Sequence, residues 1–372
     1  MKVAIVHDWL VTYAGAEKVT EQIIKIYPNA DVFSLVNHLD DKHFLQGCDV
    51  TTSFIQNLPF SKSKFRNYLP LMPFAIEQFD LSDYDLIISS SFAFAKGVIT
   101  GPNQIHISYV HSPIRYAWDL QHQYLQEIAL EKGLKSLIIR STLHYIRSFD
   151  YRSSQAVDHY IANSNFIASR INKLYRRDAK VIFPPVNTNE FSLFEGKRAD
   201  YYVTASRLVP YKKVSLIIKA FNQMPEKQLL VIGDGTDFKR LKLMANDNIK
   251  LLGRVDFQTL KHHLSRAKAF LFAGIEDFGI TMVEAQACGT PLIALNKGGA
   301  LDIVKDLDSS ENPSGIFIKE QTPEGIMLAI KRFEESIFKF SPILISKNAE
   351  QFSVKNFQVS FQKHMETILG YN

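Results

Sequence analysis

The sequence predicts an α/β protein of two units, each a parallel sheet covered by helices on both faces. The chain has 372 residues, which suits about two domains at roughly 150 residues each. Short apolar runs rich in strand-forming residues alternate with helical spacings, and this alternation is typical of such sheets. The pattern opens at Lys2–Val6 and opens again at Tyr201–Ala205. This recurrence indicates two separate units of the same class.

The first unit begins with a buried strand over Lys2–Val6. A loop with Gly15 follows, and the apolar spacing over Ala16–Ile26 predicts a helix packed on the sheet. Helical patterns then alternate with further predicted strands at Leu86–Ser89, Ile105–Val110 and His159–Ala162.

The second unit follows a joint near Phe183–Pro185, because two prolines stiffen the chain without adding to a sheet. Its first strand leads to a helix over Val214–Asn222, and the last stretch, Ser346–Leu369, also has helical spacing. The later predicted strands are Gln228–Ile232, Ile249–Leu252, Ala269–Phe272 and Pro291–Ala294. The patterns divide the chain into residues 1–185, 186–345 and 346–372.

The composition limits the class of protein. Hydrophobic residues make up 46% of the chain and charged residues 22%, which excludes a disordered or fibrous protein. No stretch approaches the ~20 apolar residues that a membrane span needs, and His7 and Asp8 interrupt the apolar start, so we expect no signal peptide. Two cysteines, Cys48 and Cys288, are too few for a disulfide framework. These features predict a cytoplasmic protein.

The most informative motif is Gly274–Gly289, at the end of a predicted strand. Glu276 lies in a loop, Gly279 allows a tight turn, and a helix begins near Ile280. The free N–H groups of that first turn favour a phosphate, and Glu276 and Glu284 flank it with acceptors for hydroxyl groups. This arrangement suits a sugar, a diphosphate and a ribose. The alternative is an acidic cap that only stabilises the helix.

Basic residues follow the first strand of the second unit. Arg207 and Lys212 lie between that strand and a helix, where they could neutralise a diphosphate. The alternative is a solvated surface loop. Gly233–Gly235 and Gly253–Val255 also follow strands and could let a ligand come close to the backbone, although ordinary turns use the same residues.

Two residues of the first unit are also candidates. Gly15 could let a diphosphate approach the first loop, and His111 ends a strand, although a turn and a structural histidine are the plainer interpretations. Asp83 and Asp85 look like a metal-binding pair, but they precede a buried strand and we interpret them as its entry. No zinc spacing, dinucleotide fingerprint or Walker loop occurs in the sequence, which disfavours a dehydrogenase or a P-loop ATPase.

Taken together, these residues resemble the retaining glycosyltransferases of family 4, which have the GT-B fold. The resemblance covers nearly the whole chain. The motifs that carry it are His7–Leu10, Gly15–Val19, Tyr109–Pro113 with Arg115, Pro184–Val186, Ser206–Leu208 with Lys212, and the pair Glu276 and Glu284. The first of these blocks and the stretch from Tyr109 to Asp119 are most similar to mannosyltransferases of O-antigen and capsule assembly that use GDP-mannose.

The resemblance implies a role for each matching residue. Arg207 and Lys212 would bind the donor diphosphate, Glu276 the hydroxyls of the donor sugar and Glu284 the ribose. His111 would lie beside the reacting sugar. The other donor-binding residues would be Gly15, Arg254, Phe278, Gly279, Ile280 and Thr281. In this fold two Rossmann-like domains face a central cleft, and the C-terminal helix crosses back to the first domain.

The implied reaction is transfer of a hexose, with retention, onto a glycan or a lipid-linked saccharide. The expected donor is GDP-mannose; the family implies no essential metal and no other cofactor, and nothing in the sequence indicates a nucleic acid partner. The alternatives are a UDP-sugar as donor, a nucleotide-sugar-binding protein without transferase activity, and a GT-B epimerase or phosphorylase.

One segment holds more than the whole net charge of +5. Residues 131–180 carry ten basic and four acidic residues. Its basic residues are interleaved with apolar ones, a pattern typical of a helix at a membrane surface; they include Lys132, Lys135, Arg140, Arg147 and Arg152. The alternative is a helix packed on the sheet with a solvated basic face. We predict contact with an anionic membrane, at the inner face of the cell membrane.

Overall fold

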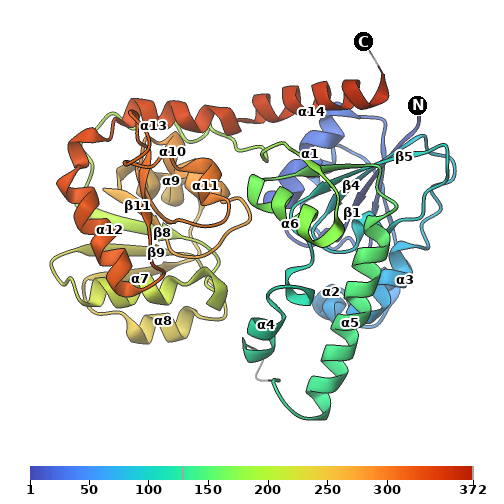
Figure 1. Ribbon diagram of the computed structural model, residues 1–372, viewed down its shortest axis with the longest axis horizontal. Helices are drawn as coiled ribbons and strands as arrows, with labels where there is room; N and C mark the ends of the chain where they lie inside the picture. Colours follow the sequence, from blue (N-terminus) through green and yellow to red (C-terminus); the bar gives the residue numbers. More distant parts are fainter. Residues whose placement is uncertain (128–129, 371–372) are drawn as a thin grey trace. The chain divides into compact units, whose positions relative to one another are not determined.

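The computed structural model describes residues 1–127 and 130–370, so the last two residues of the predicted C-terminal segment lie outside the described residues. The chain forms two compact units (Figure 1), each described here by itself. Unit 1 comprises Met1–Pro184 with Gln358–Asn372, and unit 2 comprises Pro185–Phe357. No helix of the described part is long and apolar enough to cross a membrane.

Unit 1 contains a parallel sheet of seven described strands with the first strand near its centre. In spatial order the strands are β3 (Val50–Thr52), β2 (Asp31–Ser34), β1 (Val3–His7), β4 (Leu86–Ser91), β5 (Ile105–Val110), β6 (His159–Ala162) and β7 (Ala179–Val181). The α-helices described in this unit are α1 (Gly15–Ile26), α2 (Ser61–Lys64), α3 (Met72–Ile76), α4 (Gln121–Glu127), α5 (Leu134–Ser154) and α6 (Asn165–Tyr175).

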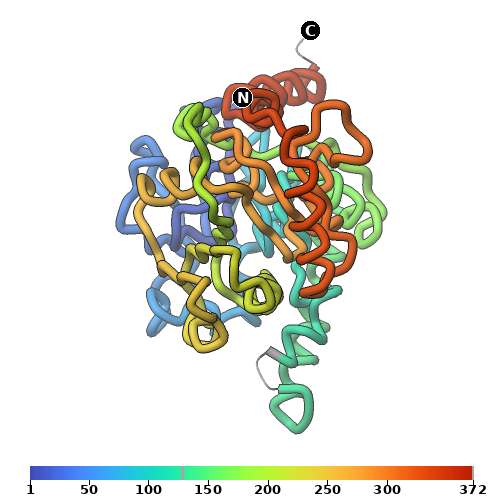
Figure 2. Tube along the Cα trace, turned by 90° about the vertical axis from the view of Figure 1, so that its left-hand side faces the viewer, coloured from blue at the N-terminus to red at the C-terminus, as the bar shows by residue number. Residues whose placement is uncertain are grey.

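Each face of the unit 1 sheet is apolar, as expected for parallel strands buried on both sides. Ala4 and Val6 of β1 pack in one core with Ile146 of α5 and Ile76 of α3. The C-terminal helix α14 (Val354–Leu369) reaches this unit (Figures 1 and 2) and contacts α1 where Gln358 donates to Gln22 at 2.8 Å.

Unit 2 contains a parallel sheet of six described strands. In spatial order they are β10 (Ile249–Gly253), β9 (Gln228–Ile232), β8 (Tyr201–Ala205), β11 (Ala269–Phe272), β12 (Leu292–Leu295) and β13 (Gly315–Ile318). The α-helices between them and after them are α7 (Val214–Asn222), α8 (Phe238–Met244), α9 (Phe257–Arg266), α10 (Ile280–Ala287), α11 (Ala300–Ile303), α12 (Pro323–Glu335) and α13 (Pro342–Ala349). Apolar residues of α7 and α12 pack together with those of β8, β9 and β11.

Both sheets reverse their strand order beside the first strand of the unit. In unit 1, β1 lies between β2 and β4, and in unit 2, β8 lies between β9 and β11. Ligands of open α/β sheets bind outside the carboxyl ends of the strands at such a switch point. We therefore expect ligands to bind at the loops after β1 and β4 in unit 1 and after β8 and β11 in unit 2.

The predicted class of two parallel sheets with helices is confirmed, with corrections to individual elements. The helical spacing over Ser346–Leu369 is wrong as one helix: α13 ends at Ala349 and α14 begins at Val354. The break arises because the chain there pairs with Val186, whose N–H donates to the Phe352 carbonyl at 2.9 Å. The short strands β2, β3, β7 and β13 were not predicted.

Candidate functional site

In unit 2 the loops that follow neighbouring strands pack against each other by their backbones. The N–H of Gly233, after β9, donates to the carbonyl of Gly253, the last residue of β10, at 2.8 Å. A Cβ atom on Gly233 would lie 1.9 Å from the carbonyl oxygen of Ser206, after β8. Only glycine fits there, and Gly233 also has φ +129°. Gly233, which sequence alone leaves ambiguous, is therefore required for the close approach of the loops.

The next pair of loops brings together Lys212 and Glu276. Lys212 ends the turn after β8, Glu276 follows β11, and their side chains form an ion pair. The Lys212 ammonium also lies 5.5 Å from the ring centre of Phe272. The two side chains are 12% and 19% exposed, so both remain accessible to a ligand. A lysine and a carboxylate predicted for different parts of one donor thus meet at the switch point of the sheet.

The Glu276 loop rests on the loop after β12, which lies outside the motifs that the sequence predicts to be functional. The N–H of Gly299, after β12, donates to the Glu276 carbonyl at 2.8 Å. A Cβ atom on Gly299 would lie 2.3 Å from the Phe278 carbonyl oxygen. Gly298 beside it has φ +72°, which favours glycine. The signal in the sequence was the pair of adjacent glycines directly after a predicted strand.

Helix α10 begins where the motif predicts. Its N-cap is Gly279, with φ +115°, and Ile280 and Thr281 form its half-buried first turn. Phe278 is buried and packs on Phe352, with ring centres 5.4 Å apart. Glu284 is one turn further along and only 7% exposed. The first turn of α10 is thus held beside the Lys212 and Glu276 pair.

Two predicted basic residues lie on the surface of the same sheet edge. Arg207 is exposed in the turn after β8, and Arg254 is exposed directly after β10. Within the described residues neither guanidinium has a hydrogen-bond or ion-pair partner. Arg207 shares its turn with Lys212, whereas Arg254 follows β10, which β9 and β8 separate from β11, so Arg207 is the better placed for the same anion.

In unit 1 the carboxyl edge is built from buried polar groups. Asp8, after β1, is completely buried, and its carboxylate accepts hydrogen bonds from the N–H groups of four successive residues, Phe92 to Ala95. Burial raises the pKa of the Asp8 carboxyl, and hydrogen bonds from the backbone oppose part of that rise. The carboxylate therefore fixes the loop after β4.

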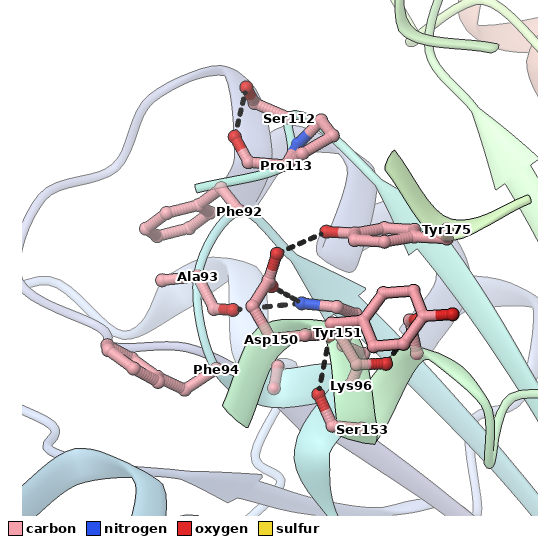
Figure 3. Close-up of polar contacts among 12 residues, drawn as sticks. Phe92, Ala93, Phe94, Lys96, Ser112, Pro113, Asp150, Tyr151, Ser153 and Tyr175 are labelled. Atoms are coloured by element: carbon pink, nitrogen blue, oxygen red, sulfur yellow. Dashed lines mark hydrogen bonds and ion pairs between the residues drawn. The ribbon is translucent and has the colours of Figure 1, made fainter. Parts of the chain in front are cut away.

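The same loop is fixed from the other side by a buried ion pair. Lys96 contacts Asp150 of α5 and donates to the Ala93 carbonyl at 3.2 Å, while Tyr175 donates to Asp150 at 2.9 Å (Figure 3). Trp118, in the loop after β5, donates to the same carboxylate at 2.7 Å. Because every partner is satisfied, removing one member would leave a buried charge and cost about 3–5 kcal/mol.

The two predicted site residues of unit 1, His111 and Gly15, lie on different elements. His111 directly follows β5 and contacts Ser90 of β4 at 2.9 Å. Burial, with a smaller effect of the nearby His7, lowers the pKa of His111 to about 3, so the ring is neutral at pH 7. Gly15 is the first residue of α1. That helix also carries Glu17, which lies 3.4 Å from His7.

The predicted basic segment is a long helix, α5, but its basic residues are not equivalent. Arg147 is partly buried and donates to the Ala117 carbonyl at 2.7 Å, and Arg152 pairs with Glu77. Arg147 is thus engaged within unit 1, and membrane contact by residues 132–152 stays a prediction. The first half extends away from the rest of unit 1 in both views (Figures 1 and 2). Its exposed apolar residues are Leu134, Leu137 and Ile138.

No group of three or more His, Cys, Asp or Glu side chains that could hold a metal ion occurs in residues 1–127 and 130–370. Asp85, one of the acidic pair before β4, instead accepts a hydrogen bond from the Lys2 N–H at 2.6 Å. That contact joins the entries of β1 and β4.

Comparison with known families gives two matches that together span most of the chain. The model "Glycosyltransferase Family 4" matches residues 13–190, and the model "Glycosyl transferases group 1" matches residues 186–349. The boundary between them coincides with the start of unit 2.

Curated relatives match at modest identity. A GDP-mannose-dependent monoacylated alpha-(1-6)-phosphatidylinositol monomannoside mannosyltransferase of Corynebacterium glutamicum is 39% identical over 114 residues, 27% of this chain and 30% of that protein. An O-antigen chain mannosyltransferase of Salmonella typhimurium is 25% identical over 315 residues, 70% of this chain and 88% of that protein. The chain spans less than two thirds of the length of several curated relatives that it matches.

Solved structures share the fold over the full length. The structure of Anabaena HepE in complex with UDP and glucose has a TM-score of 0.66 and 19% sequence identity, and the match covers 98% of this chain and 99% of that one. At this identity the likeness shows the fold alone.

Proposed function

Because this chain belongs to glycosyltransferase family 4 and has the GT-B fold, we propose that it transfers a hexose from a nucleotide sugar onto a saccharide, with retention of configuration. The observation that carries the proposal is the meeting of Lys212, Glu276 and the first turn of α10 at the switch point of unit 2. A cation, a carboxylate and a helix N-terminus together suit a sugar diphosphate.

Unit 2 supplies the charges for the donor. Arg207 and Lys212 hold the diphosphate, together with N–H groups of the first turn of α10. Glu276 accepts hydrogen bonds from hydroxyls of the hexose, and Glu284 from the ribose. Since Lys212 pairs with Glu276, a diphosphate that binds Lys212 competes with Glu276 for the ammonium and releases the carboxylate to the sugar.

The chemical step breaks the bond between C1 of the hexose and the phosphate oxygen and forms a bond from C1 to the acceptor oxygen on the same face. The acceptor hydroxyl gives its proton to the departing phosphate oxygen. Arg207, Lys212 and the helix N-terminus stabilise the charge that develops on that oxygen. This step needs no enzyme nucleophile and no metal ion.

We propose GDP-mannose as the donor. The support is that the curated relatives from Corynebacterium glutamicum and Salmonella typhimurium are both mannosyltransferases, the first of them GDP-mannose-dependent. A UDP-sugar is the second candidate, because a protein of the same fold was solved with UDP.

A thermal-shift screen of GDP-mannose, GDP-glucose, UDP-glucose and UDP-N-acetylglucosamine tests the donor. A ligand at 100 times its Kd adds about 2.7 kcal/mol of stability. Slow release of free mannose from GDP-mannose without acceptor would support an active transferase. Binding without any hydrolysis or transfer would indicate a binding protein. Stabilisation by UDP-sugars alone would make a UDP-sugar, and not GDP-mannose, the donor. No response to any sugar nucleotide would contradict the proposal.

We also propose that the first half of α5 binds an anionic membrane and so brings the enzyme to a lipid-linked acceptor. Its exposed apolar side chains, Leu134, Leu137 and Ile138, are 74%, 60% and 58% exposed. Lys132 and Lys135 are exposed beside them. Apolar side chains flanked by lysines suit the boundary between lipid headgroups and acyl chains.

Flotation with vesicles of phosphatidylcholine and phosphatidylglycerol tests this contact. The double variant Lys132→Glu, Lys135→Glu should bind the vesicles several-fold less, because each basic residue near an anionic surface is worth about 1 kcal/mol. A matched control reverses two exposed lysines of α14, Lys355→Glu and Lys363→Glu. Equal binding by both double variants would contradict the membrane contact.

A further inference from the structure

Five polar side chains meet inside unit 1 at the carboxyl ends of β1, β4 and β5. They come from α1 and from three neighbouring strands or the loops after them: Glu17, Thr20, His7, Ser90 and His111. His7 and Ser90 are direct partners in the ladder between β1 and β4. The first four are buried, whereas His111 reaches the surface of the unit.

The contacts run in series from a carboxylate to His111. Glu17 Oε1 lies 3.4 Å from Nε2 of His7, and Nδ1 of His7 lies 3.2 Å from Oγ of Ser90. Ser90 Oγ lies 2.9 Å from Nε2 of His111. Thr20 Oγ1 lies beside the series, 3.0 Å from both the His7 Nδ1 and the Ser90 Oγ.

The inventory of protons limits how these contacts can be used. An ionised carboxylate only accepts, so His7 donates from Nε2 and accepts at Nδ1. Each hydroxyl has one proton, and Nδ1 of His7 has one lone pair, so at most four of the five contacts can be hydrogen bonds at once. Thr20 can also donate to the Ala16 carbonyl, 3.2 Å away, and with that contact included every arrangement that makes four hydrogen bonds still requires His111 to donate from Nε2 to Ser90. If Ser90 instead donates to His111, only three can form.

We propose that Glu17, His7 and Ser90 are positioning residues that hold the proton of His111 on Nε2, so that Nδ1 offers a lone pair to a hydroxyl group of the ligand. Within the described residues Nδ1 of His111 has no hydrogen-bond partner. The ligand hydroxyl belongs to a saccharide, and this identity rests on the proposed function. The position of the proton on His111 does not depend on the proposed function.

The electrostatics of the site agree with an acceptor role. The lowered pKa of His111, about 3, keeps the ring neutral at pH 7, so the lone pair on Nδ1 is available. The same low basicity makes His111 a poor general base. Its task is therefore to orient a hydroxyl group and leave the proton transfer to the departing phosphate oxygen.

Long-range ¹H–¹⁵N NMR of ligand-free protein labelled at histidine tests the proton placement. The ring signals of His7 and His111 are assigned from the variants His7→Asn and His111→Asn. We expect both rings to carry the proton on Nε2, with a protected Nε2–H signal for His111. A proton on Nδ1 of His111 would overturn the proposal.

Removal of two different hydroxyl groups distinguishes Ser90, which is part of the series, from Thr20, which lies beside it. Ser90→Ala should abolish the protected Nε2–H signal of His111, whereas the nearly isosteric Thr20→Val should keep it. If Ser90→Ala does not fold, Ser90→Cys keeps the volume and weakens the acceptor. Loss of the signal in Thr20→Val, or its survival in the Ser90 variant, would contradict the series.

Kinetics then test the consequence for the reaction. Ser90→Ala should lower kcat about tenfold, the size expected for one hydrogen bond, with an unchanged Kd for GDP because unit 2 holds the diphosphate. An equal loss of GDP affinity would show a merely structural role. A chain that turns over no sugar nucleotide would end the proposed function and leave the NMR result standing.

Discussion

At the carboxyl edge of its sheet, unit 1 holds its loops with buried polar side chains, whereas unit 2 holds them with glycines. In unit 1 the carboxylates of Asp8 and Asp150 accept hydrogen bonds from groups within the protein. In unit 2, Gly233 and Gly299 let backbones touch directly, so the charged side chains of the loops are not needed to hold them.

The difference separates two chemical tasks. Unit 1 presents a neutral ring, His111, on a rigid support, and this suits the orientation of uncharged hydroxyls. Unit 2 presents Arg207, Lys212 and Glu276, which suit a diphosphate and the sugar attached to it. The account therefore predicts that charge changes in unit 2 alter donor binding and catalysis, while unit 1 is sensitive to its internal hydrogen bonds.

The largest effect is expected from the two glutamates of unit 2. Glu276→Gln should mainly lower kcat, because contacts to the hexose strengthen in the transition state, and Glu284→Gln should mainly raise the donor KM. Each effect should be about ten- to a hundredfold, since a hydrogen bond to a charged group is worth about 1.5–3 kcal/mol. Calorimetry with GDP should show weaker binding only for Glu284→Gln. The reverse pattern would overturn the assignment.

The next effect concerns Lys212. Lys212→Ala should lower activity at least tenfold, about 1.4 kcal/mol. The substitution removes the positive charge that binds the diphosphate, and it leaves Glu276 without its partner. Lys213→Ala, the adjacent residue, is the matched control. Wild-type activity should persist in EDTA; activity that disappears with EDTA and returns with Mg²⁺ would show that a metal, and not Lys212, holds the diphosphate.

A smaller effect is expected from the glycine support of the Glu276 loop. Gly299→Ala places a methyl group against the Phe278 carbonyl, 2.3 Å from an ideal Cβ, and must displace the loop. Strain of about 1–3 kcal/mol should weaken GDP binding about tenfold. Gly101→Ala in unit 1, where the nearest atom lies at 3.5 Å, should change nothing. Normal GDP binding by Gly299→Ala would show that the loop does not need this support.

The smallest effect is a pH dependence of unit 1. Burial lowers the pKa of His106 to about 4 and that of His111 to about 3, below the usual 6.5 of an unfolded histidine. Below pH 6.5 the unfolded chain thus binds more protons than the folded chain. The two buried histidines therefore contribute their full share of folding stability above that pH, and this contribution is lost as the pH falls. Two such groups predict a loss of about 1 kcal/mol between pH 7 and pH 6.

Hydrogen exchange of full-length protein checks this prediction, because peptides report each unit separately. Peptides from β4 and β5 should open more readily at pH 6 than at pH 7, after correction for the intrinsic exchange rate. Peptides from β12 and β13 of unit 2 serve as the internal control, because β8 contains Tyr201, a contact of His263, whose pKa burial also lowers. An equal change in both sheets would contradict the assignment to these histidines.

Sequence alone predicted the elements whose pattern is strong. Buried apolar strands such as Ile105–Val110, and the helix over Val214–Asn222, agree with the structure to the residue. Strands of three or four residues, such as β3 and β7 at the sheet edges, lack enough alternating positions to show a period. The break before Val354 depends on pairing with Val186, a contact distant in sequence that no local pattern contains.

For the candidate site the same limit applies. The spacing of Glu276, Gly279 and Glu284 is local and was read directly. The series that links Glu17, His7, Ser90 and His111 was not predicted, because its members lie up to 104 positions apart in the chain and meet only when β1, β4 and β5 pair. Three successive serines in the buried strand β4 were the available signal, since buried hydroxyls require partners.

The central claim, that the charged part of the donor binds to unit 2, is tested most directly by hydrogen exchange of the full-length protein with and without GDP. The account predicts protection in the loops after β8, β11 and β12 and in the first turn of α10, which cover residues 206–213, 274–284 and 296–299. The loops after β1, β4 and β5 should change little with the nucleotide alone. Protection confined to the loops of unit 1, with none in these three segments, would contradict it.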